Sequence, residues 1–202
     1  PEETFKLKTT LSSAARAPTI NELFIDGVSQ GLAALEQGDV GLNPEQTYAF
    51  NVDLSWKPTR WFDAHVTGYT QYIDDYIFLT PDLDDNGDPR VALTINGGFP
   101  AFQWRQVDAL FWGVDADATL KPTRWLELRS QAAIVRARDV QNDAFLPFIP
   151  PDFFKQEIRL KATSLGVLKD NYLSATSAYT AQQRRFDINT DFTDAPEGYH
   201  LL

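Results

Sequence analysis

The feature that most constrains the fold of this chain is an alternation of apolar and polar residues on both sides of a repeated motif. The five residues Lys-Pro-Thr-Arg-Trp occur at 57–61 and again at 121–125. Proline suits the first corner of a tight turn because its ring fixes φ. Residues 48–56 and 62–68 alternate around the first motif, and residues 114–120 and 126–134 around the second. A period of two indicates strands with one apolar face, so each motif is predicted to close a β-hairpin.

The same alternation predicts further strands over residues 5–11, 154–162 and 173–179, and a last strand that begins at Gly198. In the strand that starts at Gln103, the phase of the alternation changes. Apolar residues occupy odd positions from Val107 to Phe111 and even positions from Val114 to Ala118. A shift of one residue exchanges the faces of a strand, so we predict a β-bulge at Trp112–Gly113.

Short and long connections alternate along the chain. The connections near 57–60, 121–124 and 165–170 are short, whereas those near 18–46, 80–100, 139–151 and 182–197 are long and rich in Asp, Asn, Gly and Pro. Outer-membrane β-barrels combine short periplasmic turns with long extracellular loops and carry aromatic girdles at both interfaces. Aromatic residues stand near both kinds of connection here: Trp56, Trp61, Trp125, Tyr72, Tyr76 and Phe78.

We therefore predict an all-β fold, an antiparallel up-and-down transmembrane β-barrel segment of about seven to eight strands within a larger barrel. Several strands exceed the ~9–11 residues that cross a bilayer. The polar face is also very polar for a protein core. A soluble β-sandwich that binds carbohydrate would show the same alternation, because its sheets can turn a polar face to water, and it stays an alternative.

Composition excludes several classes of protein. The 202 residues contain no Cys, which removes disulfide scaffolds, thiol catalysis and thiolate metal sites. The net charge of −10 argues against nucleic acid as a partner. No apolar stretch approaches the ~18 residues of a membrane-spanning helix. The absence of Met, at position 1 as elsewhere, indicates processed material or a piece of a longer chain.

Two segments near the start of the chain carry a combination of motifs. The first contains Arg16-Ala-Pro followed by Glu22-Leu-Phe, and the second reads Leu42-Asn-Pro-Glu-Gln-Thr. Gln106-Val-Asp-Ala and Trp112-Gly-Val-Asp follow later. In combination, over roughly residues 5 to 165, they resemble the barrel of TonB-dependent outer-membrane receptors. The chain departs from that pattern at Ala15, where the family usually has Phe, and at Asp115, where it usually has Glu.

The resemblance implies active import of a metal chelate, such as an iron–siderophore complex, across the outer membrane of a Gram-negative cell. The partners it implies are this chelate or another small-molecule ligand, outer-membrane lipid, a plug domain with the rest of the barrel, and an inner-membrane energy-coupling complex. No plug domain is visible, so we expect residues 1–202 to form one partial barrel domain. A passive porin-like outer-membrane barrel is an alternative, and iron siderophore, haem, cobalamin, zinc and oligosaccharide stay open as ligands.

No pattern points to an enzyme. The sequence has no Gly-x-Ser-x-Gly, P-loop or dinucleotide fingerprint. Asp74 and Asp75 are adjacent, and adjacent residues of a strand point to opposite faces, so they are poor partners for glycoside hydrolysis. We expect no catalytic residues and no cofactor.

We also expect no metal site. The segment 82–88 resembles the opening of a Ca²⁺ loop, but Leu93 stands where such a loop needs a bidentate Glu. The two histidines, at 65 and 200, are far apart in sequence.

Four residues are candidates for contact with a ligand: His65, Tyr69, Gln71 and Arg105. The first three lie on the polar face of a strand, and the last lies where a long loop re-enters one.

Overall fold

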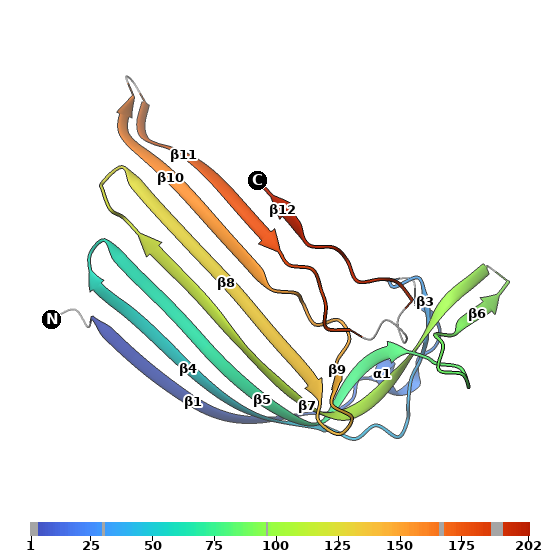
Figure 1. Cartoon of the computed structure of the whole chain (residues 1–202). Helices are drawn as coiled ribbons and strands as arrows, with labels where there is room; N and C mark the ends of the chain where they lie inside the picture. Colours follow the sequence, from blue (N-terminus) through green and yellow to red (C-terminus); the bar gives the residue numbers. More distant parts are fainter. Residues whose placement is uncertain (1–3, 30, 96, 166–167, 187–191) are drawn as a thin grey trace.

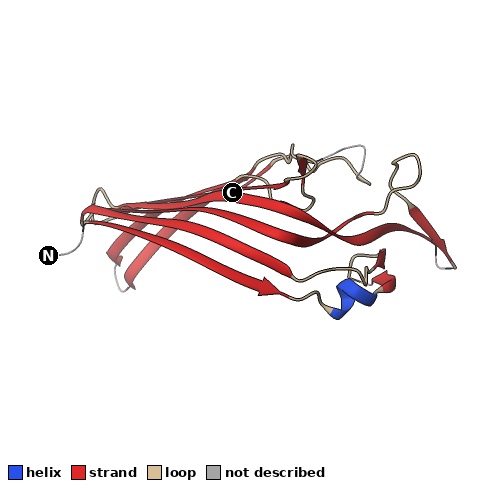
Figure 2. Cartoon of the chain, turned by 90° about the horizontal axis from the view of Figure 1, so that it is seen from below, coloured by secondary structure: helices blue, strands red, loops and turns tan. Residues whose placement is uncertain are grey.

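The computed structural model describes residues 4–29, 31–95, 97–165, 168–186 and 192–202. In these residues the chain forms one curved sheet whose long strands run side by side, with short turns at one end and loops gathered at the other (Figures 1 and 2). The elements are β1 (Phe5–Arg16), α1 (Ile20–Phe24), β2 (Asp26–Ser29), β3 (Ala34–Gln37), β4 (Glu45–Thr59), β5 (Phe62–Pro81), β6 (Val91–Thr94), β7 (Gly97–Leu120), β8 (Leu126–Asp139), β9 (Ala144–Phe145), β10 (Phe153–Leu165), β11 (Leu168–Thr180) and β12 (Tyr199–Leu201).

The strands follow one another as an antiparallel meander. Their order is β1-β4-β5-β7-β8-β10-β11-β12, so eight strands form the main path through the described part of the chain. Strand β5 has 20 residues and β7 has 24, well beyond the ~9–11 that cross a bilayer. This architecture confirms the predicted barrel segment. It also excludes a β-sandwich, which needs two packed sheets, because the main path is a single continuous sheet.

The short turns close the hairpins where the repeated motif predicts them. The turn between β4 and β5 lies at 60–61, and that between β7 and β8 at 121–125. The predicted turn near 165–170 joins β10 to β11, but its residues 166–167 lie outside the described ones. The long connections contain α1 and the short strands β2, β3, β6 and β9. One of these, β3, pairs with β7 in parallel, which the alternation did not predict.

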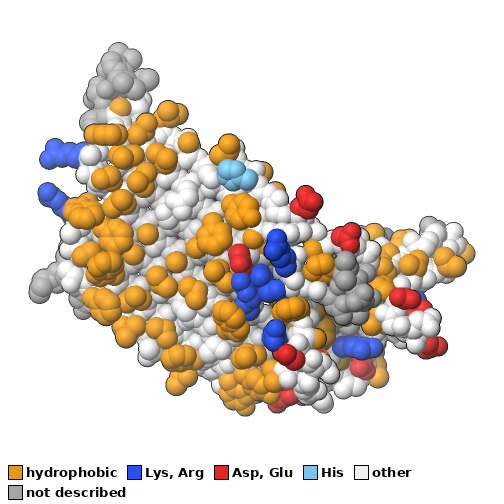
Figure 3. All heavy atoms as spheres, viewed as in Figure 1, with side chains coloured by type: hydrophobic (Ala, Val, Ile, Leu, Met, Phe, Trp, Pro, Cys, Tyr) orange, Lys and Arg blue, Asp and Glu red, His pale blue; other side chains and the backbone are white. Residues whose placement is uncertain are grey.

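The register places the apolar residues of neighbouring strands in common rows on one face. One row joins Leu7, Leu54, Val66, Ala116 and Ala132 across five strands. Large side chains on this face lie open, such as Leu11 at 81% exposed and Leu173 at 71%. Figure 3 shows hydrophobic side chains spread over this broad face of the sheet. An open apolar surface of this extent indicates contact with lipid or another partner rather than with water.

The predicted bulge at Trp112–Gly113 is wrong. Strand β7 pairs with β8 without interruption from Ala109 to Leu120. The irregularity lies on β5 instead, where Asp74 and Asp75 together face β7 residue Asp108. Asp75 adopts a φ of 58°, and its backbone N–H donates to the Asp108 carboxylate over 3.3 Å.

The phase change that prompted this prediction has another cause. The odd-numbered apolar residues of β7 stay on the polar face, where they pack in an apolar cluster near the long loops. Its buried members are Ile73, Ala109, Ala137 and Leu146, with Val107, Phe111, Tyr76, Phe78 and Ile149 packed against them. Along β7, the apolar side chains lie on the polar face of the sheet near the long loops and on the apolar face nearer the short turns. The alternation therefore changes phase although the register does not. Among the described residues, no helix is long and apolar enough to cross a membrane.

Candidate functional site

The polar face of β4, β5 and β7 carries a hydrogen-bonded group around His65. The Nδ1 atom of His65 lies 3.0 Å from the Ser55 hydroxyl, and its Nε2 atom 3.2 Å from the Thr67 hydroxyl. Thr67 donates to the Asp53 carboxylate over 2.8 Å, and Asp117 lies opposite His65 on β7. Contacts to both ring nitrogens hold the imidazole in one orientation. The group therefore presents hydrogen-bonding side chains in fixed positions on this wall.

Tyr69 and Gln71 extend this wall on the same face of β5. Tyr69 lies across Gly113 of β7, its partner in the register. A Cβ atom on residue 113 would lie 2.4 Å from the Tyr69 hydroxyl oxygen and 2.5 Å from the backbone oxygen of Ile134. Glycine at 113 therefore provides room for the tyrosine ring. Gln71 lies opposite Phe111, at the edge of the apolar cluster.

Arg105 lies apart from the other three candidate residues. It belongs to β7, and the β7 residue opposite His65 is Asp117. The 12 residues from 105 to 117 correspond to about 40 Å at ~3.3 Å per residue. Arg105 is exposed near the long loops, opposite Phe78. The structure thus brings His65, Tyr69 and Gln71 together on one strand and leaves Arg105 near the loop end.

An ionic cluster that the sequence analysis did not identify anchors the first long loop. Arg16 at the end of β1 contacts Glu45 of β4 over 2.6 Å and Glu22 of α1 over 2.9 Å. Glu45 also accepts from the backbone N–H of Ile77 over 2.7 Å. Thr19 caps α1: its hydroxyl accepts from the Glu22 N–H, and the Glu22 carboxylate accepts from the Thr19 N–H. Burial raises the pKa of the Glu22 carboxyl, but the hydrogen bonds from Arg16 and Thr19 outweigh it and hold the pKa below its ordinary value.

A signal for this cluster was present in the sequence. Arg16, Glu22 and Glu45 all stand in the motifs that carry the family resemblance, and their charges are complementary. All three converge where β1, α1 and β4 meet, and the two carboxylates are buried. Their geometry shows a structural role, because it fastens a loop to the end of the sheet.

The acidic segment 82–88 forms a compact turn. The Asp84 carboxylate accepts from the backbone N–H groups of Asn86 over 2.8 Å and Asp88 over 3.0 Å. These hydrogen bonds, with that from Asp88 the largest contribution, lower the pKa of the Asp84 carboxyl. Gly87 takes a φ of 90°, which permits the tight reversal. The Oδ1 atom of Asp84 accepts both of these hydrogen bonds and so stabilises the turn.

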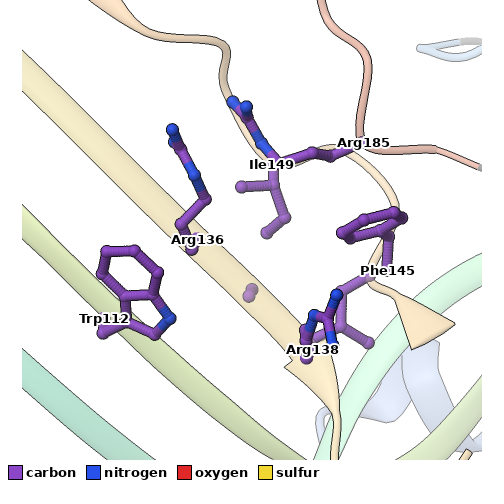
Figure 4. Close-up of a pocket in the computed structure, with 8 residues that line it drawn as sticks. Trp112, Arg136, Arg138, Phe145, Ile149 and Arg185 are labelled. Atoms are coloured by element: carbon purple, nitrogen blue, oxygen red, sulfur yellow. The ribbon is translucent and has the colours of Figure 1, made fainter. Parts of the chain in front are cut away.

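A cavity of about 480 Å³ lies at the long-loop end, beside β8 (Figure 4). Arg136 contacts the Asp152 carboxylate at 2.5 and 3.0 Å, and Arg185 reaches the same carboxylate at 3.1 Å. The Arg136 guanidinium also lies 5.9 Å from the centre of the Trp112 ring. These bonds, first of all that from Arg136, lower the pKa of the Asp152 carboxyl despite its partial burial. The sequence contained one signal of this cavity, because Arg136 stands at an even position of β8, where the alternation places apolar residues.

Metal-ligating side chains are scattered over the described residues. No three side chains of the types His, Cys, Asp and Glu gather there closely enough to hold a metal ion. His200 lies on β12 and pairs with the Ser177 hydroxyl at 2.7 Å, whereas His65 lies on β5.

Comparison with solved structures shows the same fold. The copper transporter OprC matches with a TM-score of 0.74 at 20% identity, over 100% of this chain and 28% of that one. A variant of the ferric enterobactin receptor PfeA from Pseudomonas aeruginosa matches with a TM-score of 0.65 at 17% identity, over 98% and 29%. The siderophore receptor PirA from Acinetobacter baumannii matches with a TM-score of 0.63 at 14% identity, over 98% and 32%. The chain thus spans about a third or less of the length of these proteins.

The family comparison covers the whole chain. Residues 1–202 match the family described as "TonB dependent receptor-like, beta-barrel". The meander of long strands, the open apolar face and the hydrogen-bonded polar face are what the wall of such a barrel requires. This chain belongs to the β-barrel of the TonB-dependent receptor family.

Proposed function

We propose that this chain is part of the wall of a Gram-negative outer-membrane receptor that imports a metal chelate, such as an iron–siderophore complex, by active transport. The observation that carries the proposal is the two-faced sheet in a chain of the TonB-dependent receptor family. One face is open and apolar, which suits lipid, and the other is polar and hydrogen-bonded, which suits the interior of a barrel. The similar solved structures include a copper transporter, a ferric enterobactin receptor and a siderophore receptor.

The proposal assigns roles to the candidate residues. His65, Tyr69 and Gln71 line the interior wall along the path of the ligand, and Arg105 contributes positive charge near the long loops. Metal chelates with carboxylate or catecholate donors are anionic, so a cation near the entrance attracts them. The plug domain, the remaining barrel and the inner-membrane energy-coupling complex act together with this segment. None of these roles needs a catalytic residue or a resident cofactor in this chain.

Uptake by living cells tests the function. A strain that lacks the gene would be compared with the same strain carrying the full-length protein, under iron restriction, with radiolabelled ferric enterobactin and a copper chelate as probes. We expect the full-length protein to restore uptake of at least one probe, and a protonophore to abolish it. Uptake that continues after the proton gradient collapses would favour the passive porin-like alternative instead.

Substitutions on the polar face test the assigned roles. His65→Ala with Gln71→Ala is expected to lower the uptake rate at limiting ligand concentration more than at saturation, because the change weakens contact with the ligand. Thr119→Ala, on the same face near the short turns, is the matched control and should leave uptake unchanged. Equal uptake by the double variant and the control would remove these residues from the ligand path.

A further inference from the structure

The two repeated Lys-Pro-Thr-Arg-Trp turns, which the proposed function leaves without a role, lie next to each other. Because β5 pairs with β7, the turn at 57–61 adjoins the turn at 121–125. The backbone N–H of Lys121 donates to the carbonyl of Trp61 over 2.7 Å, and the N–H of Lys161 donates to the carbonyl of Trp125 over 2.8 Å. Lys161 thus occupies the position in the third hairpin that Lys121 occupies in the second. Successive hairpins repeat a lysine about every 10 Å along this rim of the sheet.

Cations surround a cavity of about 430 Å³ between these turns. Arg60, Lys121, Arg124 and Lys161 line it together with one carboxylate, that of Glu127. Glu127 is only 1% exposed and already binds two cations, Lys161 and, over 2.6 Å, an arginine of the same strand. Within the described ranges, the side chains of Arg60, Lys121 and Arg124 form no ion pair, and all three are exposed. The cavity therefore holds an excess of positive charge in a chain whose net charge is −10.

Tryptophans mark this rim as the boundary of the apolar face. Trp56, Trp61 and Trp125 are 47%, 49% and 56% exposed. Trp61 lines the cavity, and Trp56 packs edge-on against Phe62 with ring centres 5.3 Å apart. Figure 3 shows Lys and Arg side chains projecting beyond the hydrophobic face at the short-turn end. Indole rings favour the level of lipid headgroups, so the free cations lie where phosphate groups of a bilayer would meet them.

We propose that the rim cluster, formed by Arg60, Lys121, Arg124 and Trp61, binds the phosphate of an anionic phospholipid in the leaflet at the short-turn end. The inference rests on the proposed placement of the protein in the outer membrane. Arginine offers a fork of donors that matches phosphate, and lysine adds a mobile point charge. Inorganic phosphate would satisfy the cations alone, whereas a phospholipid also covers the indole ring. The chemistry of the cluster therefore favours an amphiphile over a soluble anion.

Native mass spectrometry of the full-length protein in neutral detergent tests the proposal. The probes are phosphatidylglycerol and cardiolipin, with phosphatidylcholine as the zwitterionic reference. The test variant is Arg60→Gln/Lys121→Gln/Arg124→Gln. The control, Lys8→Gln/Lys155→Gln/Arg184→Gln, removes the same charge from positions outside the rim cluster, two of them exposed and Lys155 half-buried. We expect the test variant to lose preference for the anionic lipids, by about fivefold for each cation removed at low salt, and the control to keep it.

The remaining outcomes distinguish a lipid phosphate from a soluble anion. They also distinguish a failure of this inference from a failure of the proposed function. Displacement of phosphatidylglycerol by millimolar inorganic phosphate would assign the cluster to a soluble anion and overturn the inference. Loss of binding to purified cell-wall sacculi in the test variant, with lipid preference intact, would overturn it in favour of a cell-wall contact. A protein that fractionates with the outer membrane and restores uptake, but lacks any anionic preference, would refute this inference alone. Absence from the outer membrane would refute the proposed function.

Discussion

Arginine in place of Val52 should destabilise the full-length protein in a bilayer by about 2–4 kcal/mol, whereas arginine in place of the neighbouring Asn51 should cost much less. The two residues lie on opposite faces of β4. Val52 pairs with Thr9 and Gly68 on the apolar face, and Asn51 pairs with Tyr69 on the polar face. A charge loses its hydration in hydrocarbon but keeps it, or finds a partner, in a polar interior.

The size of this effect follows from the depth of Val52. It is the middle residue of β4, which spans 15 residues, and Tyr48 and Trp56 stand four residues to either side on the same face. At ~3.3 Å per residue and a tilt near 40°, four residues correspond to about 10 Å along the barrel axis. The two aromatic rings are then about 20 Å apart, close to the ~25 Å apolar band between aromatic girdles. Val52 therefore lies near the midplane, where the cost of an arginine is greatest.

Equilibrium unfolding of the full-length protein from phospholipid liposomes by urea measures both costs. Stability alone cannot separate lipid from a soluble core, because both penalise a charge at Val52. Single cysteines at positions 50 to 53, each carrying a fluorophore, provide the second measurement, since the segment has no native cysteine. Labels that replace Phe50 and Val52 should be quenched by lipid-phase quenchers, and those that replace Asn51 and Asp53 should be protected. Water-accessible labels at Phe50 and Val52 without lipid-phase quenching would refute the reasoning.

Three further predictions concern particular contacts. Gly113→Ala should destabilise the protein by about 1–3 kcal/mol, because the new methyl group meets both the Tyr69 hydroxyl and a backbone oxygen; full stability in urea unfolding would contradict the close approach. The lowered pKa of Glu22 means that its ionised form stabilises the docked loop above its ordinary pKa of 4.5 and that this contribution is lost as the pH falls through the lowered value. The protection of residues 19–24 against hydrogen exchange, taken relative to the intrinsic rate at each pH, should therefore fall with acidification, and Glu22→Gln should show low protection at every pH. Calorimetry should detect no Ca²⁺ binding tighter than millimolar at the turn of Asp84, and micromolar binding abolished by Asp84→Ala would show that the turn is a calcium loop.

The faces of the strands could be predicted from the alternation because side-chain direction in a strand has a period of two. The apolar residues of β4, such as Leu54, lie in rows with those of β1 and β5 as expected. The alternation misled us in β7, where Ala109 and Phe111 are apolar for a different reason. They pack on the polar face against a cluster that includes Leu146, which is contributed by a loop. A pattern within one strand carries no information about a loop that folds over its far end.

The heights of side chains along the barrel could not be predicted, because they depend on register rather than on pattern. His65 and Arg105 both lie on the polar face of the sheet, so the alternation alone would place them in one site. The pairing of β5 with β7 separates them by about 40 Å, and the bulge at Asp74–Asp75 sets that pairing beyond Ile73. The bulge has no apolar signature, since it consists of two carboxylates next to a third. A ligand path that involves both residues must therefore extend along the wall, with Arg105 met near the loops and His65 much deeper, and uptake variants should separate these two stages.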